Sequence, residues 1–349
     1  MICGIIKEHS PSAIGSAPCG IKLYYYYTTS VINCKGCVFM DCLNPMLAVK
    51  SGDHFRFIGS ANKFKNDKVL FDASGESRFI VLPCGQCMAC RLNKSREWAT
   101  RCVLEAKMHD ENCFITLTYD DEHLPKDYGL QKQDFTNFIK RLRKNTGSKI
   151  RYFAAGEYGD LYSRPHYHAC IFGWKPSDLV LYSVRNGVNL YMSETILKAW
   201  QYQGFVTVGD VTFESAAYVA RYVTKKITGS QAEDHYQGRQ PEYTVMSRRP
   251  GIAASFFEKY STDIYGKDFI VIRDQIKCKP PRYFDRIYDS YYGEGSFEVD
   301  VKSRRLDKAF TQFLKSDLHE YTLNRIVNRA RFKEIRYKTK FRRSLDEVI

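Results

Sequence analysis

The chain has 349 residues, 44% of them hydrophobic, and a formal net charge of +14. This hydrophobic content excludes a wholly disordered chain, and no apolar run reaches the ~18–20 residues needed to cross a membrane. The basic charge and the 14% aromatic residues favour a nucleic-acid partner, single strands in particular, although proteins that bind anionic membranes or ribosomes are also basic. Because no secretory signal is evident, we expect a cytoplasmic protein without a membrane partner.

Composition divides the chain into three parts. Residues 1–39 contain four consecutive tyrosines and no sustained periodicity, and Met40 offers a second chain start, so we interpret 1–39 as an extension that begins at an upstream start codon. We expect a folded domain with a cysteine-rich start at 40–240 and a basic, irregular region at 241–349. Residues 301–349 hold 14 Lys or Arg against 6 Asp or Glu, which is typical of a solvated helical tail or of one that binds DNA.

The first motif in the chain is a group of closely spaced cysteines. Short alternating runs at 46–83 indicate strands, and Cys84, Cys87 and Cys90 follow as two overlapping Cys-x-x-Cys pairs. Cys42 would supply a fourth thiolate for tetrahedral Zn²⁺. We expect a structural zinc site here, since 12 cysteines in 349 residues are too sparse for a disulfide scaffold. Free cysteines at a tight turn are the alternative.

The segment from residue 95 to residue 227 alternates between predicted helices and strands. Apolar stripes with helical spacing predict amphipathic helices, and β-branched and aromatic runs predict strands. In chain order we expect a helix at 95–109, a strand at 113–119, a helix at 132–144, strands at 150–157 and 164–173, a helix at 194–201, a strand at 205–209 and a helix at 213–227. This order predicts an α+β fold with a central antiparallel sheet and helices on one face. Candidate contacts to DNA phosphates precede or open the first helix: Arg91, Lys94 and Arg96.

Two histidines lie in the strand predicted at 164–173. Side chains alternate between the faces of a strand, so His166 and His168 project from the same face. Two neutral imidazoles are half of a divalent-metal site, although two histidines on an ordinary half-exposed strand are the alternative. Glu157 ends the preceding strand, and antiparallel pairing would place it beside them. Two nitrogens and one carboxylate oxygen suit Mn²⁺ or Mg²⁺, whereas a surface carboxylate is the alternative for Glu157.

Two tyrosines lie one turn apart in the last predicted helix. Tyr218 and Tyr222 are spaced i, i+4, and Lys225 follows at i+7, with Lys226 beside it. Tyr218, Tyr222 and Lys225 share one helical face, which is offset from the alanine-rich stripe that packs inward. A phenol acts as a nucleophile when a metal polarises the electrophile and a cation lies nearby. The alternative is a pair of aromatic residues on a half-buried helix.

These motifs occur in the order found in the HUH endonuclease superfamily. Three segments resemble the three motifs of its replication initiators: Phe114–Tyr119, Arg164–His168 and Tyr218–Lys226. A narrower resemblance, to the replication initiators of gokushoviruses (single-stranded DNA phages of the Microviridae), lies in Met40–Pro45, Pro83–Arg91 and Met246–Ile252. It spans about residues 40–290 and leaves 1–39 without a counterpart.

The resemblance implies a ferredoxin-like palm and a metal-dependent enzyme that nicks and rejoins single-stranded DNA. Its target would be the origin of a circular viral genome, where rolling-circle replication begins. His166 and His168, with Glu157 as the third ligand, would hold the cation. Tyr218 or Tyr222 would attack the phosphate to form a 5′-phosphotyrosine and release a 3′-OH that primes synthesis.

Further residues and partners follow from the same resemblance. Lys225 would lie near the developing charge, and Arg164 and Lys226 would contact DNA. The sequence has no Gly-x-x-x-x-Gly-Lys-Ser/Thr motif, so the helicase and the polymerase would come from the host, in the host cytoplasm. Two other interpretations remain: a non-catalytic, zinc-containing DNA-binding protein, and a plasmid relaxase or transposase of the same superfamily. The phage-like motifs disfavour the relaxase and the transposase.

Overall fold

The computed structural model divides the chain into two compact units: Met1–Cys90 with Glu298–Ile349, and Arg91–Phe297. The residues that the structure describes are 42–51, 54–60, 79–159, 162–185, 187–225, 231–272, 276–305, 307–308, 331–332 and 335. The expected extension at 1–39 and the candidate DNA contact Lys226 lie outside the described residues. None of the described helices is both long and apolar enough to cross a membrane.

The first unit contains a small antiparallel sheet in the order β2-β1-β3. Its strands are β1 (Met46–Ser51), β2 (His54–Ser60) and β3 (Phe79–Leu82). They confirm the strands that the alternating runs at 46–83 predicted. The buried side chains of β1 are Leu47 and Ala48, so the described core of this unit is small.

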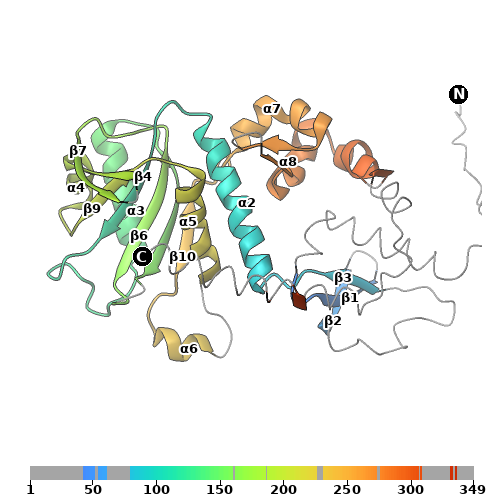
Figure 1. Ribbon diagram of the computed structural model, residues 1–349, viewed down its shortest axis with the longest axis horizontal. Coiled ribbons are helices and arrows are strands. Elements are labelled where there is room, and N and C mark those ends of the chain that lie inside the picture. The colour runs from blue at the N-terminus through green and yellow to red at the C-terminus, as the bar shows by residue number, and fades with distance from the viewer. Residues whose placement is uncertain are drawn as a thin grey trace, which may run out of the picture. The chain divides into compact units, whose positions relative to one another are not determined.

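The second unit is built on a seven-stranded sheet in the order β10-β5-β6-β4-β9-β8-β7, with every neighbouring pair antiparallel (Figure 1). In chain order its strands are β4 (Asn112–Thr118), β5 (Arg151–Tyr158), β6 (Pro165–Phe172), β7 (Leu179–Arg185), β8 (Val188–Ser193), β9 (Val206–Gly209) and β10 (Tyr243–Met246). The α+β class and the central antiparallel sheet are confirmed. The histidine strand, β6, lies inside the sheet between β5 and β4.

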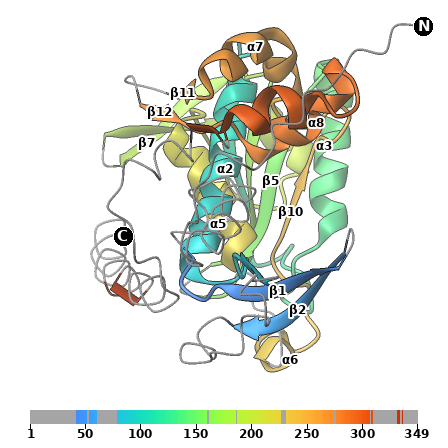
Figure 2. The same ribbon diagram turned by 90° about the vertical axis from the view of Figure 1, so that its right-hand side faces the viewer.

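Helices cover both faces of this sheet, which corrects the expectation of helices on one face. The four are α2 (Met88–Ala106), α3 (Lys132–Thr146), α4 (Glu194–Trp200) and α5 (Phe213–Lys225). On one face α3 and α4 pack against Tyr167, Ala169 and Ile171 of β6, and on the other α2 and α5 pack against Cys170 and Phe172. The reason is that β6 is apolar on both sides, so each face needs a cover. Figure 2 shows α2 and α5 side by side.

The predicted ends of two helices are explained by their caps. The Ser193 hydroxyl accepts a hydrogen bond from the Ile196 amide at 3.3 Å and begins α4, as expected. The Thr212 hydroxyl accepts one from the Ser215 amide at 3.1 Å, and the Ser215 hydroxyl accepts one from the Thr212 amide at 2.8 Å, so the two residues cap α5 reciprocally. Helix α2 starts at Met88, inside the cysteine motif and earlier than predicted.

The described residues between 241 and 302 form helices and strands where we expected an irregular region. Strand β10 joins the main sheet beside β5, and the Phe257 ring packs at a tilt against Phe284 with centroids 5.4 Å apart, joining α7 to α8. The elements that follow β9, apart from α5 and β10, are α6 (Gln231–Tyr236), α7 (Ala254–Lys267), β11 (Ile270–Val271), β12 (Lys277–Cys278), α8 (Arg282–Tyr292) and the π-helix at Phe297–Lys302. The second unit therefore continues past residue 240, where we expected the basic region to begin.

Candidate active site

Pairing between β5 and β6 brings the three candidate metal ligands together. Glu157 lies directly opposite His166 in the register, and His168 follows two residues along the same face. Glu157 Oε1 lies 2.7 Å from His166 Nε2 and 2.8 Å from His168 Nε2. One ligand atom from each residue lies within 4.8 Å of the others. The predicted antiparallel pairing is confirmed, and this part of the molecule can hold a metal ion.

The far nitrogen of each imidazole also has a hydrogen-bond partner. His166 Nδ1 lies 3.0 Å from the main-chain carbonyl oxygen of Arg164, and His168 Nδ1 lies 2.9 Å from the Thr116 hydroxyl on β4. Because a carbonyl only accepts, Nδ1 of His166 carries the proton in the neutral ring, and Nε2 turns a lone pair toward Glu157. Two acceptor atoms 2.7 Å apart need a positive charge between them, either a proton or a metal ion. The donor set therefore fits a cation.

The Glu157 carboxylate is charged and almost fully buried, with 2% of its side chain exposed. Burial alone would raise the pKa of Glu157, but its close contacts with His166 and His168, which share a proton with the carboxylate when no metal is bound, outweigh it and lower the pKa to about 2. The group is therefore an anion throughout the pH range of ordinary assays, which a cation ligand requires.

Helix α5 places the Tyr218 hydroxyl at this cluster. Ala216 and Ala220 are small and buried, so the helix packs closely on the sheet. The Tyr218 hydroxyl lies 3.4 Å from Glu157 Oε1, and its ring packs edge-on against His168 with centroids 4.9 Å apart. Tyr218 is thus the tyrosine that the structure places beside the candidate ligands.

The other residues predicted on α5 are placed less completely. The backbones of Tyr222 and Lys225 belong to α5, but their side chains lie outside the described part of the chain. Arg221 was not among the predicted residues; its exposed guanidinium lies 5.5 Å from the Tyr218 ring centroid. Its i, i+3 spacing from Tyr218 was the signal that would have found it.

The described residues predicted to contact DNA lie on α2 and just before β6. Arg164 donates hydrogen bonds to Asp121 at 2.5 Å and to the Tyr119 carbonyl at 3.0 Å, so it holds the segment that follows β4. Lys94 and Arg96 are exposed on α2, and Arg91 is half-buried. Their contact with DNA stays a prediction.

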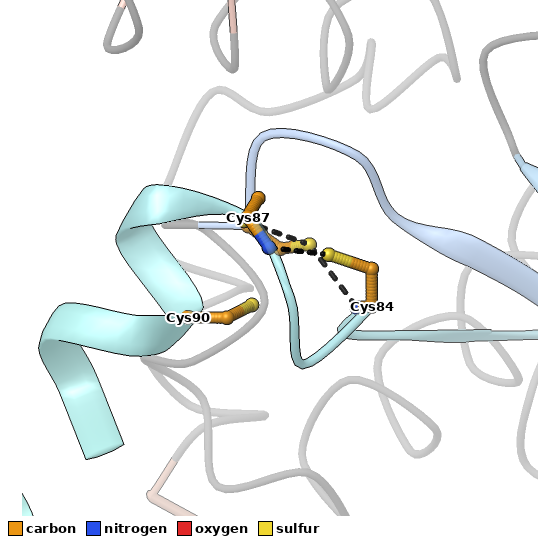
Figure 3. Close-up of side chains that lie close together, drawn as sticks. Cys84, Cys87 and Cys90 are labelled. Atoms are coloured by element: carbon orange, nitrogen blue, oxygen red, sulfur yellow. Dashed lines mark hydrogen bonds between the residues drawn. The ribbon is translucent and has the colours of Figure 1, made fainter. Parts of the chain in front are cut away.

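A second group of candidate ligands lies in the first unit. Sulfur atoms of Cys42, Cys84, Cys87 and Cys90 all lie within 4.8 Å of one another, and the four cysteines form no disulfide. Figure 3 shows the last three turned toward each other where α2 begins. The amides of Leu43 and Cys87 donate to Cys87 Sγ at 3.3 Å and Cys84 Sγ at 3.2 Å, respectively. Hydrogen bonds from Cys42 and Cys90 lower the pKa of the Cys87 thiol, which favours a thiolate.

The fold and these sites define an α+β protein with a candidate cation site beside a helical tyrosine, and comparison with known proteins gives the family. A family model whose description begins "Replication-associated protein ORF2" matches residues 112–227, which include this cation site and Tyr218. No solved structure matches the chain.

Phage replication proteins are similar to most of the chain. Replication-associated protein VP4 of Bdellovibrio phage phiMH2K is 35% identical over 282 residues, which cover 78% of this chain and 85% of the relative. Replication-associated protein ORF2 of Spiroplasma virus 4 is 34% identical over 286 residues, which cover 76% of this chain and 86% of the relative. Replication-associated protein ORF4 of Chlamydia phage 1 is 33% identical over 232 residues, which cover 63% of this chain and 56% of the relative. The chain belongs to this family of phage replication-associated proteins, and its resemblance to gokushovirus replication initiators is confirmed.

Proposed function

We propose that this protein is a metal-dependent enzyme that nicks and rejoins single-stranded DNA at the phage origin and so starts rolling-circle replication. One observation carries the proposal: the Tyr218 hydroxyl lies 3.4 Å from Glu157 Oε1, the oxygen that also contacts both imidazoles. A nucleophile and a cation site thus meet at one atom. That convergence supports an enzyme over the alternatives of a structural histidine pair and a structural tyrosine.

The reaction uses Tyr218 as the nucleophile. Glu157, His166 and His168 would hold the divalent cation, Mn²⁺ or Mg²⁺, and the cation would supply positive charge to polarise the scissile phosphate. The phenol gives its proton to solvent water, its oxygen bonds to phosphorus, and the bond from phosphorus to the 3′ oxygen breaks. The departing 3′ oxygen takes up a proton. The products are a 5′-phosphotyrosine and a 3′-OH that primes synthesis; attack of a 3′-OH on the phosphotyrosine reverses the step and joins the ends.

Neighbouring residues of α5 complete the proposal. Tyr222, one turn further along α5, cuts the regenerated origin as the second nucleophile. Lys225 and the exposed Arg221 supply positive charge toward the phosphates. The host provides the helicase and the polymerase, and the reaction takes place in the host cytoplasm.

The family supports a replication initiator over the other interpretations. The relatives are named replication-associated proteins of phages, which supports this role over that of a plasmid relaxase or a transposase. The meeting of Tyr218 with the ligand cluster supports an enzyme over a non-catalytic DNA-binding protein.

The test is covalent capture of DNA by the full-length protein. Single-stranded oligonucleotides that tile the phage genome are incubated with protein and Mn²⁺, and adducts are separated on denaturing gels. We expect an adduct with the wild type and with Tyr182→Phe, a control at an exposed tyrosine of β7, which three strands separate from β6. We expect none with Tyr218→Phe plus Tyr222→Phe, because no phenol remains on α5 to attack. An adduct from the double variant contradicts the tyrosine assignment, and no adduct from the wild type favours the DNA-binding alternative.

We further propose that Cys42, Cys84, Cys87 and Cys90 hold a structural Zn²⁺. Four sulfurs bound to tetrahedral zinc at about 2.3 Å lie roughly 3.8 Å apart. The sulfurs of Cys42 and Cys87 are 3.9 Å apart, close to that value. Amide donors to the sulfurs offset the negative charge that four thiolates bring. The zinc would fasten the start of α2 to the segment that precedes β1.

A further inference from the structure

We infer that Thr116 is a positioning residue whose hydroxyl holds the His168 imidazole with Nε2 toward Glu157. Thr116 lies on β4 directly opposite His168 on β6, and its Oγ1 is 2.9 Å from His168 Nδ1. The inference rests on the proposed function, because it concerns the cation that His168 would bind. The strand motif Phe114–Tyr119 would thus orient a metal ligand, a role that its apolar pattern does not predict.

The hydrogen bond to Thr116 helps to set which edge of the ring faces the site. Phe114 stacks on the His168 ring at 5.9 Å between centroids, and Tyr218 packs edge-on at 4.9 Å. These contacts fix the plane of the ring, but a half-turn about Cβ–Cγ leaves its shape nearly unchanged and exchanges Nε2 with Cε1. Only a polar contact distinguishes the two orientations, because a carbon at the Nε2 position cannot bind a cation. Thr116 makes such a contact at Nδ1, on the opposite edge from the contact of Nε2 with Glu157.

The two imidazoles are oriented in different ways. His166 Nδ1 donates to the carbonyl of Arg164, a main-chain group that no side-chain substitution removes. His168 depends on a side chain, so its orientation is open to mutation. The hydroxyl also accepts or donates as needed. It therefore accepts from Nδ1–H when Nε2 binds a cation.

The same strand offers a matched control. Thr118 lies two residues from Thr116 on the same face and opposite His166. Its hydroxyl donates to the Phe205 carbonyl at 2.8 Å instead of contacting a histidine. Thr116→Val and Thr118→Val each remove one hydroxyl from β4 and keep the β-branched shape, but only the first changes the imidazole contact.

The test is Mn²⁺ affinity, measured on the full-length protein by electron paramagnetic resonance of free Mn²⁺. We expect Thr116→Val to weaken binding about 10–100-fold, the range typical when the partner of a metal-bound histidine is lost. We expect Thr116→Ser, which keeps the hydroxyl, to restore most of the affinity, and Thr118→Val to match the wild type. Adduct formation by Thr116→Val should recover at saturating Mn²⁺, because a bound cation holds the ring in place.

The outcomes separate this inference from the proposed function. If His168→Ala abolishes Mn²⁺ binding but Thr116→Val binds like the wild type, the inference fails and the metal site stands. If the wild type has no His168-dependent Mn²⁺ site, the proposed metal site fails. Equal losses in Thr116→Val and Thr118→Val would mean a general weakening of β4 and would also overturn the positioning role.

Discussion

At the scale of single residues, Glu157 holds the candidate active site together. One oxygen of its carboxylate contacts both imidazoles and faces the Tyr218 hydroxyl. The side chain is 2% exposed, and a buried charge of this kind is costly unless opposite charge compensates it. A cation or a protonated histidine provides that compensation. Glu157 therefore both contacts the cation or protonated histidine and holds the Tyr218 hydroxyl beside it.

We expect Glu157→Gln to separate DNA binding from DNA cleavage. The amide keeps the size of the side chain but removes the negative charge of a ligand, so Mn²⁺ affinity should fall by roughly 100-fold or more, beyond the range typical for residues that only support a ligand. DNA binding should persist because the protein becomes more basic. Mn²⁺ titration, adduct formation and oligonucleotide binding measure the three properties, with Glu157→Asp as the charge-conserving control. Cleavage at the wild-type rate by Glu157→Gln would contradict the ligand role.

The sequence predicted the ligands and the first tyrosine but not their supporting residues. Glu157 and His166 are separated by a short turn, so simple strand alternation places them opposite each other. The contact between Thr116 and His168 depends on β4 pairing with β6, and α3 and β5 lie between these strands in the chain. Local periodicity carries no information about such a distant register. Thr116 was therefore visible as part of a strand but not as a partner of His168.

At the scale of elements, one buried carboxylate joins α2, β5 and the start of α7. Glu105 accepts hydrogen bonds from the Arg151 guanidinium and, at 2.5 Å, from the Ala253 amide, and it lies 3.3 Å from His109 Nε2. Its side chain is 1% exposed. Burial alone would raise the pKa of Glu105, but these hydrogen bonds outweigh it and lower the pKa. The network fixes α2 over the sheet face that carries the candidate ligands.

We expect Glu105→Gln to lower the free energy of unfolding by about 3 kcal/mol at pH 7, because it removes the buried carboxylate that neutralises the half-buried Arg151 charge. The lowered pKa means that the carboxylate stabilises the fold above its ordinary value of 4.5 and that this stability is lost as the pH falls below it. The difference between wild type and variant should therefore shrink on acidification. Urea unfolding at pH 7 and pH 4 measures it, with the exposed Glu122→Gln as control. A constant difference at both pH values would rule out a role for the charge.

Some elements could be predicted from the sequence and others could not. Helix α5 and strand β6 were predictable because their apolar residues follow the helical and strand periods. The β7–β8 hairpin was missed although Asn186 and Gly187, a strong turn signal, separate its strands; Gly187 has φ +76°. Helices α7 and α8 were missed because aromatic rings such as Phe257 and Phe284, rather than an aliphatic stripe, form their contact.

At the scale of the whole molecule, the two units differ in what stabilises them. The second unit has two apolar clusters, one on each face of its sheet. The described part of the first unit has a three-stranded sheet, few buried side chains and the four-cysteine group. Small sheets with little core usually need a disulfide or a metal to be stable. The proposed zinc would meet that need in the first unit.

We expect the purified protein to contain one Zn²⁺ per chain and to lose order in one unit when the zinc is removed. Chelation should abolish hydrogen-exchange protection in β1, β2 and β3, because the cysteines no longer join the start of the unit to α2. Amides of β4, β5 and β6 should keep their protection, which makes them the internal control. Plasma emission spectroscopy measures the zinc. Protein without zinc, or unchanged protection of β1 to β3 after chelation, would contradict a structural metal.

The order of the site along the chain has a consequence for synthesis. All three candidate cation ligands come from the β5–β6 hairpin, whereas Tyr218 comes from α5, which the ribosome makes only after four further elements. A chain that stops between β6 and α5 has the ligands but lacks the nucleophile. In the proposed reaction such a fragment has no α5 phenol with which to break DNA. Because α5 is translated after the β5–β6 hairpin, the incomplete protein cannot yet cut DNA.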